Sequence, residues 1–301
     1  MGSRVKGWLL IACAFILAGV LLYGGLFLKA GRSFSSAFGM RPDTVTEQVR
    51  QPFRDIEVRG STEDVEFRPS EDGKCRVVFR EHENGKHTAS VKDGTLVIER
   101  SGGRKWYERF TLFSFGTESI TVFLPEREYG ALLVKESTGD VTISEAFSFE
   151  SVDVALSTGD AVCRASAAGL LRIGTGTGSI RVSNVTAGTV DLSVSTGRTI
   201  AENVSCGAFA SDGGTGSITL ENVVAAGNMT IERGTGDVRL ALCDAAEISI
   251  RTSTGDVTGT LRTGKTFAVK SGTGRIRVPE GGSGGPCRIT TSTGDVEISV
   301  P

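Results

Sequence analysis

The sequence has little of what most enzymes and metal sites are built from. Its only two histidines, His82 and His87, fall in one charged stretch, and no Cys-x-x-Cys or Cys/His spacing suggests zinc. No Gly-x-Ser-x-Gly, Walker A or His-Glu-x-x-His motif occurs, and no Gly-x-Gly-x-x-Gly leads from a strand into a helix. The sequence therefore predicts a protein that is not an enzyme and needs no cofactor.

A strong net charge is missing as well. With 33 basic and 35 acidic residues the formal charge is −2, so the chain has no general attraction to nucleic acid. Its 40 glycines lack the three-residue period of collagen and fit a turn-rich β protein instead. No segment after Gly139 shows a helical period of apolar residues.

The six cysteines are too scattered to indicate a disulfide framework. Each of the last four stands where a neighbouring repeat has a small or apolar residue, so we expect free thiols that fill the core. The six are Cys13, Cys75, Cys163, Cys206, Cys243 and Cys287.

One long apolar run stands near the N-terminus. Trp8 to Leu28 is uncharged and long enough to span a bilayer. We predict an uncleaved signal anchor over 7–29, with residues 1–6 in the cytoplasm and 30–301 outside; a cleaved secretory signal is the alternative. The polar segment 30–50 is predicted to be a stalk.

What the sequence has in abundance is a repeat. A tetrapeptide of Ser or Gly, then Thr-Gly, then Asp, Ser or Arg recurs with successive glycines 19 or 20 residues apart. A short regular period of this kind is typical of a solenoid, in which one small unit stacks on copies of itself. The nine Thr-Gly pairs are Thr138-Gly139, Thr158-Gly159, Thr177-Gly178, Thr196-Gly197, Thr215-Gly216, Thr235-Gly236, Thr254-Gly255, Thr273-Gly274 and Thr293-Gly294.

Each repeat contains two short stretches of alternating apolar residues. One follows the tetrapeptide, as in Val141 and Ile143, and the other precedes the next tetrapeptide, as in Val152 and Val154. A period of two indicates strands with one buried face, and glycine marks the corners between them. The pattern predicts an all-β fold: a parallel β-solenoid over 137–301, with right-handed coils of about 19 residues, preceded by one transmembrane helix.

Residues 51–136 have weaker β patterning and are predicted to form irregular N-terminal coils. They contain an insert, residues 101–117, in which aromatic and basic residues are mixed. Two interpretations stay open for this insert: a contact surface for glycans, partners or lipid, and a cap over the N-terminal end of the solenoid. Its candidate contact residues are Arg104, Trp106, Tyr107, Phe110, Phe113 and Phe115.

The side chains of the tetrapeptide also allow two interpretations each. Strand alternation predicts that the invariant threonine faces inward and bonds backbone at the corner, while an exposed ice-binding face is the alternative. The acidic position after the glycine is interpreted as a solvated turn residue, with calcium at Asp140/Asp160 or Asp237/Asp256 as the alternative. The sequence stops just after the strand of the ninth tetrapeptide, which predicts an open sheet edge there.

The Ser-Thr-Gly-Asp-Val-x-Ile repeat resembles the bacterial putative-adhesin family of β-strand-repeat proteins. The lead-in Ile120–Pro125, followed by Ser137–Val141, strengthens the resemblance, which covers about residues 52–301. It implies an exported or membrane-tethered β-solenoid, often with one N-terminal membrane segment, and it assigns no functional residue.

These observations predict a non-enzymatic, membrane-anchored β-solenoid outside the cytoplasmic membrane that acts in adhesion or as an envelope scaffold. Its partners would be the membrane, through Trp8–Leu28, and a glycan, cell-wall or protein ligand, with end-to-end or edge self-association as a further expectation. Two alternatives remain: an envelope-sensing or regulatory partner of membrane proteins, and a polysaccharide-cleaving β-helix enzyme.

Overall fold

The computed structural model describes residues 43–81, 87–101 and 118–300, together with positions 15, 17 and 19. Apart from these three positions, the predicted signal anchor over 7–29 lies outside the described residues, and so does the insert after Ser101. Residues 43–49, at the end of the predicted stalk, form a strand. Within the part that is described, no helix is both long and apolar enough to cross a bilayer.

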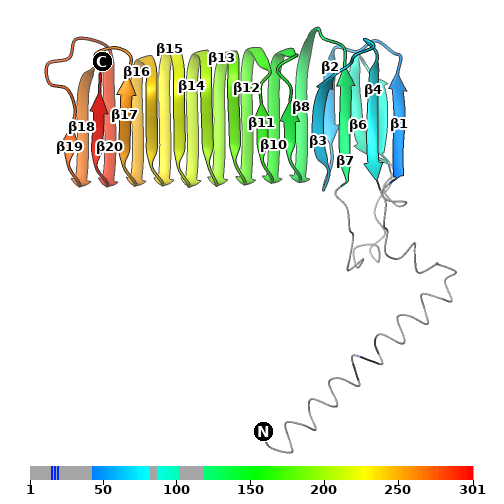
Figure 1. Ribbon diagram of the computed structural model, residues 1–301, viewed down its shortest axis with the longest axis horizontal. Coiled ribbons are helices and arrows are strands. Elements are labelled where there is room, and N and C mark those ends of the chain that lie inside the picture. The colour runs from blue at the N-terminus through cyan, green and yellow to red at the C-terminus, as the bar shows by residue number, and fades with distance from the viewer. Residues whose placement is uncertain are drawn as a thin grey trace, which may run out of the picture. The chain divides into compact units, whose positions relative to one another are not determined.

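The regular part of the chain is a stack of coils (Figure 1). Its strands are β8 (Glu128–Thr138), β9 (Val141–Ile143), β10 (Ser148–Thr158), β11 (Ala161–Cys163), β12 (Ser166–Thr177), β13 (Ile180–Thr196), β14 (Thr199–Thr215), β15 (Ile218–Thr235) and β16 (Val238–Thr254). Each coil pairs in parallel with the next one along the chain, so that equivalent residues of successive repeats lie side by side. The predicted all-β parallel β-solenoid is confirmed.

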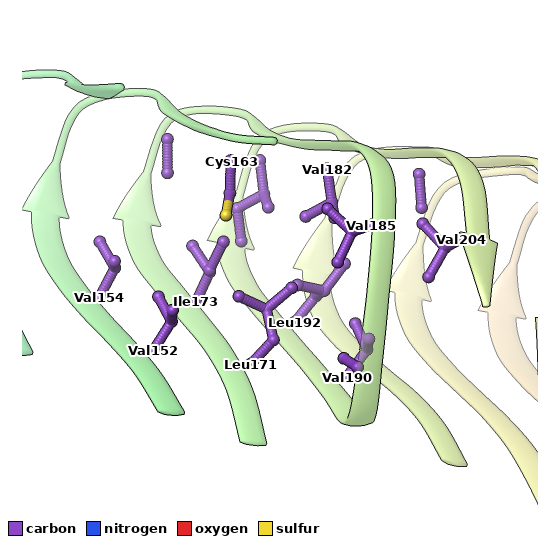
Figure 2. Packing of buried hydrophobic residues seen from close by; sticks show 14 of the residues in the cluster. Val152, Val154, Cys163, Leu171, Ile173, Val182, Val185, Val190, Leu192 and Val204 are labelled. Carbon is purple, nitrogen blue, oxygen red and sulfur yellow. The ribbon is translucent and has the colours of Figure 1, made fainter. Parts of the chain in front are cut away.

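Aliphatic side chains fill the interior in columns that run from coil to coil (Figure 2). Val152, Leu171 and Val190 form one such column, because they are register partners in β10, β12 and β13. All three are fully shielded from solvent. One coil cannot bury its own apolar face, so stacking creates the core. Each side chain buried in this way contributes roughly 1.5–3 kcal/mol of transfer free energy.

The five described cysteines belong to this core, as the sequence predicts for the last four of them. All are free and buried, and Cys163 lies in a column between Ile143 and Val182. Burial raises the pKa of the Cys163 thiol to about 12, so it stays protonated at neutral pH. These cysteines therefore act as small apolar side chains.

The tetrapeptide glycines form the corners at which neighbouring coils come closest. Gly197 donates its N–H to the carbonyl oxygen of Thr215 in the next coil, at 2.9 Å. Its φ is 145°, a region that favours glycine. A Cβ at this position would lie 2.7 Å from the carbonyl carbon of Gly178 and would overlap its oxygen. The corner therefore needs glycine both for its backbone angle and for space.

The predicted direction of the tetrapeptide threonines is wrong. All nine are exposed and stack in one column on the outside of the solenoid. Strand alternation ends one residue earlier than expected, because the chain turns at the corner. The residue just before the tetrapeptide is the one that faces inward, and it can make the backbone hydrogen bond predicted for the threonine. Thr175, at this position, donates its hydroxyl to the carbonyl oxygen of Gly159 at 3.0 Å. An exposed threonine column is what the ice-binding alternative requires, and that alternative stays a prediction.

At the N-terminal end, the first coil in the sequence is not the first in space. The strands there are β1 (Asp43–Val49), β2 (Asp55–Arg59), β3 (Asp64–Pro69), β4 (Cys75–Glu81), β5 (His87–Lys92), β6 (Thr95–Arg100) and β7 (Ser119–Leu124). The β2–β3 coil pairs in parallel with β6 and β7 on one side and with β8 and β9 on the other. Beyond β6 and β7, the antiparallel strands β4, β1 and β5 cover this end of the stack.

The same interleaving occurs at the C-terminal end. The strands are β17 (Val257–Leu261), β18 (Thr266–Thr273), β19 (Ile276–Arg277), β20 (Pro286–Thr293) and β21 (Val296–Ser299). The last coil, β20 with β21, lies between β16 with β17 and β18 with β19 (Figure 1). The prediction of an open edge at the last strand is therefore wrong, because the edge belongs to the preceding repeat.

Glycines allow the chain to cross back over itself at this end. A Cβ on Gly284 would overlap the carbonyl oxygen of Gly264, and a Cβ on Gly285 would overlap that of Ala246. Thr266, the first residue of β18, donates its N–H to the carbonyl oxygen of Gly285, just before β20, at 3.0 Å. This bond joins the start of β18 to the start of β20. The glycine-rich segment 281–285 thus makes close backbone contacts at Gly284 and Gly285.

Candidate contact surfaces

The predicted contact residues of the insert, Arg104 to Phe115, lie outside the described residues, but both ends of the insert are described. Arg100 ends β6 and Glu118 precedes β7. Asp64 donates its N–H to the carbonyl oxygen of Glu118 at 3.0 Å. This places Glu118 beside Glu63, which holds the position of the tetrapeptide glycine in the β2–β3 coil. Glu118, the first described residue after the insert, therefore lies at a corner in line with the threonine-glycine column.

A buried ionic cluster lies at the base of the insert. His87 is sandwiched between two carboxylates, with its Nε2 3.1 Å from Glu63 Oε1 and its Nδ1 2.8 Å from Glu81 Oε2. Arg100 adds a second cation, with its Nη1 3.4 Å from Glu63 Oε1 and 3.8 Å from Glu118 Oε2. The side chains of His87 and Glu63 are only 1% exposed, so these charges depend on one another for compensation.

These contacts shift the pKa values of the cluster in opposite directions. Burial alone would raise the pKa of Glu63, but hydrogen bonds from His87 and from the backbone N–H groups of Ser61 and Thr62 outweigh it and lower the pKa to about 2. Burial alone would lower the pKa of His87, but Glu63 and Glu81 raise it. The structure therefore favours an ionised Glu63 paired with an imidazolium.

Glu136 stands apart from this pairing although it is equally buried. Neither of its carboxyl oxygens has a hydrogen-bond partner among the described residues. The carboxyl group fills the space that Gly60 leaves open in the neighbouring coil, since a Cβ on Gly60 would overlap it. Burial, with repulsion from Glu63 and Asp64, raises the pKa of Glu136 to about 8.

Glu136 gives the fold a testable pH dependence. In the unfolded chain its carboxyl ionises near its ordinary pKa of 4.5, whereas in the folded chain it keeps its proton until about pH 8. The contribution of Glu136 to stability is therefore full below pH 4.5 and falls as the pH rises to 8, by an amount on the order of a few kcal/mol. We expect Glu136→Gln to flatten this loss, measured as the difference in urea midpoint from the unmodified chain at pH 5, 6.5 and 8. The exposed Glu128→Gln on the same strand is the control, and identical slopes in all three proteins would contradict the assignment.

The aspartates after the corner glycines form a backbone-capping ladder. Asp140 Oδ1 accepts the N–H of Asp160 at 2.8 Å, and Asp160 Oδ1 accepts that of Ser179 at 2.7 Å. Asp237 Oδ1 accepts the N–H of Asp256 at 3.1 Å in the same way. As turn residues, these aspartates have a specific role, because each carboxylate accepts a hydrogen bond from a backbone N–H group of the next coil. Among the described residues, no group of three or more His, Cys, Asp or Glu side chains could hold a metal ion.

The charged side chain of Arg233 is also buried, in the interior of the stack. Arg233 Nη2 donates to Thr199 Oγ1 at 3.0 Å and to Ser211 Oγ at 2.7 Å, while its Nε and Nη1 have no partner among the described residues. The guanidinium occupies the space above Gly213, where a Cβ would overlap it. Burial lowers the pKa of Arg233 to about 10, against an opposing effect of Asp212.

The open edge of the solenoid is the β18–β19 coil. Among the described strands, β18 pairs only with β20 and β19 only with β21, which leaves one side of the coil without a neighbour. Residues equivalent to the core of other coils are therefore partly uncovered: Ile276 is 44% exposed, and Phe267, Val269 and Val278 are half-buried. The apolar interior reaches solvent here.

Basic side chains line this edge. Arg275 Nη2 lies 2.8 Å from Asp295 Oδ2, and Arg277 Nη1 lies 3.7 Å from Glu297 Oε1, both in the covered coil behind the edge. The side chain of Lys270 has no ion-pair partner among the described residues. Lysine on an edge strand discourages pairing with a second copy of the same strand.

Sequence reasoning missed the buried Glu136, the buried Arg233 and the displaced open edge. Two of them had a signal: Glu136 and Arg233 occupy a column of small or apolar residues, and each has a glycine, Gly60 or Gly213, in the same column of an adjacent coil. For the open edge at β18–β19, the glycine-rich segment 281–285 was a weaker sequence signal that this repeat differs from the others.

The fold and its corners define a β-solenoid repeat protein with one covered and one open end. A model of the Toastrack DUF4097 family matches residues 53–213 and 199–301, so the chain belongs to that family. No curated protein matches it.

Several solved structures are similar to this chain. They include a putative adhesin from Bacteroides fragilis NCTC 9343, at 14% identity and a TM-score of 0.45, covering 85% of this chain and 97% of that one. A putative lipid binding protein from Parabacteroides distasonis ATCC 8503, at 13% identity and a TM-score of 0.41, also covers 85% and 97%. A putative cell adhesion protein from Clostridium sporogenes ATCC 15579, at 14% and 0.27, covers 87% and 100%.

Proposed function

We propose that this protein is a non-enzymatic scaffold of the cell envelope. In this proposal residues 7–29 tether it to the cytoplasmic membrane, residues 30–301 lie outside, and the β18–β19 edge binds a protein partner. The observation that supports it is the difference between the two ends of the solenoid. Antiparallel strands cover the N-terminal end, whereas the C-terminal end presents an unpaired strand over an uncovered apolar interior.

The chemistry of the edge favours an extended polypeptide as its occupant. An added polypeptide would pair with the free backbone groups of β18 and β19, and its alternate side chains would cover Val269 on β18 and Ile276 on β19. The corner ladder supplies a charge preference: it runs Asp256, Asp295, Arg275 along the stack, so the last side chain before the open edge is a cation and the next position favours a carboxylate. The proposed partner is therefore a protein segment in which apolar and acidic residues alternate.

The proposal predicts that blocking the inward face of β18 abolishes partner binding. A photo-crosslinking amino acid at position 276 of the full chain, in its native envelope, should yield one protein adduct. Val269→Lys should reduce that adduct at least about tenfold, because it places a charge where the added strand would cover an apolar side chain. Ala268→Lys is the matched control, since it adds the same charge to the same strand on an exposed position.

Three outcomes would contradict the proposal. Equal adducts from Val269→Lys and Ala268→Lys would show that the edge does not bind the partner. An adduct at twice the mass of the chain would identify a second copy as the occupant. Adducts only with glycans would replace scaffolding by adhesion to the cell wall.

A further inference from the structure

A hollow of about 660 Å³ lies at the covered, N-terminal end of the solenoid, far along the chain from the β18–β19 edge. It opens where the end of β1, the turn before β4 and the segment after β7 meet. Three of its ten lining residues are cations, Arg50, Lys74 and Arg127, and none is a carboxylate. A concave site lined by charges of one sign focuses the field and favours an ion of the opposite sign.

Asp72, which precedes the lining residue Gly73 in the sequence, is already committed elsewhere. Asp72 Oδ1 accepts hydrogen bonds from Ser70 Oγ at 2.7 Å, from the Lys74 backbone N–H at 3.1 Å and from Arg76 Nη1 at 3.3 Å. Neither the Lys74 ammonium nor the exposed guanidinium of Arg50 has an ion-pair partner among the described residues. Two of the three cations are therefore available to a ligand.

The third cation is held in place. Arg127 Nη2 donates to the carbonyl oxygen of Phe53 at 2.7 Å, and its guanidinium lies over the rings of Phe53 and Tyr129, at 5.3 and 4.6 Å from their centroids. Tyr129 is fixed in turn by its hydroxyl, which donates to the carbonyl oxygen of Pro125 at 2.7 Å. A guanidinium oriented in this way loses little entropy when it binds an oxyanion through its remaining N–H groups.

We propose that this hollow binds a phosphate group carried by a larger molecule. Arg127 supplies an oriented fork that matches two phosphate oxygens, while Arg50 and Lys74 supply two further positive charges. The amide groups of Gln48 and Gln51 add hydrogen-bond donors at the rim. The volume lies in the range of small-molecule sites and exceeds what inorganic phosphate fills, so the phosphate is attached to a polyol or a similar polar group.

Two sources carry this chemistry: a soluble phosphate ester and the headgroup of an anionic lipid. The hollow begins at Gln48, 20 residues after Leu28, the last residue of the predicted membrane anchor. A chain of that length spans at most about 70 Å. A headgroup at the membrane surface is thus within reach if the proposed anchor holds, whereas a soluble ester requires no anchor.

The test uses the full chain in maltoside micelles and isothermal titration calorimetry. Its probes are glycerol 3-phosphate and the short-chain lipid dihexanoyl phosphatidylglycerol below its micelle concentration, with zwitterionic dihexanoyl phosphatidylcholine as the comparison of zero net charge. We expect both anionic probes to bind, and the double variant Arg50→Gln/Lys74→Gln to raise their Kd at least about tenfold, because two charge-assisted contacts are lost. Binding of the lipid alone would assign the site to headgroups.

Matched variants separate the site from general charge effects. Arg80→Gln removes an exposed cation from β4 outside the hollow and should leave the Kd within about twofold. Arg127→Lys keeps the charge but loses the planar fork, and should weaken binding at least about fivefold. The proposal is overturned if neither anionic probe binds, if Arg80→Gln weakens binding as much as the double variant, or if phosphatidylcholine binds as tightly as phosphatidylglycerol.

Discussion

Gly197→Ala is expected to destabilise the solenoid by at least about 3 kcal/mol, although it adds a single methyl group. Two costs combine at this corner. The φ of 145° is one that alanine rarely adopts, and the added Cβ would overlap the carbonyl oxygen of Gly178. The coils cannot move apart to relieve the overlap without breaking the hydrogen bonds on both sides of the corner. The urea midpoint followed by circular dichroism measures the loss.

Gly73→Ala separates the two costs. Gly73 also has a positive φ, 66°, but a Cβ there would meet no atom within 4 Å. Only backbone strain should appear, on the order of 1 kcal/mol. Equal losses at both positions would mean that the corners do not stack closely, and that glycine is there for its backbone angle alone.

Truncation after Gly285 is the second change with a large expected effect. It removes β20 and β21, whose side chains Cys287, Ile289, Val296 and Ile298 are at most 3% exposed. Their burial represents roughly 4–10 kcal/mol of gross transfer free energy, an upper bound on the loss. Because these strands are the partners of β18 and β19, we expect residues 262–285 to lose their order as well, so that limited proteolysis cleaves within them.

A stack in sequence order predicts a different outcome for this truncation. Removing a true end coil would leave residues 262–285 paired with β16 and protected. Such pairing could not form here simply by β18 moving inward, because Phe267 would replace Cys287 against Ile248 and overfill the core. Unchanged protection of 262–285 in the truncated chain would therefore contradict the interleaved order.

The periodic part of the fold could be predicted from the sequence because one physical rule repeats in it. Period-two apolar pairs such as Val152 and Val154 face inward in every regular coil, and the corner glycines fall in one column. The direction of Thr138 and its equivalents could not be obtained in this way, because alternation holds within a strand and fails at a corner.

The order of the coils at the two ends could not be predicted from the repeat. The spacing between Gly255 and Gly274 is 19 residues, the same as between regular coils, yet a different coil lies between them in space. The open edge depends on that order, and the hollow depends on segments that lie outside the repeat. The cations Arg50, Lys74 and Arg127 come from three separate segments outside the repeat, and nothing in their spacing indicates that they meet.

Disulfide trapping in the exposed threonine column tests the interleaved order most directly. Cysteines are introduced in pairs at Thr254, Thr273 and Thr293 in the full chain with Cys13→Ser, since the five described native cysteines are buried. Thr254 and Thr273 each pair with Thr293, within the Cα separation that a disulfide allows, whereas Thr254 and Thr273 are two coils apart. The account predicts that mild oxidation links 254 to 293 and 273 to 293 but not 254 to 273. Efficient linkage of 254 to 273 would contradict it, and with it the assignment of β18 and β19 as the open edge.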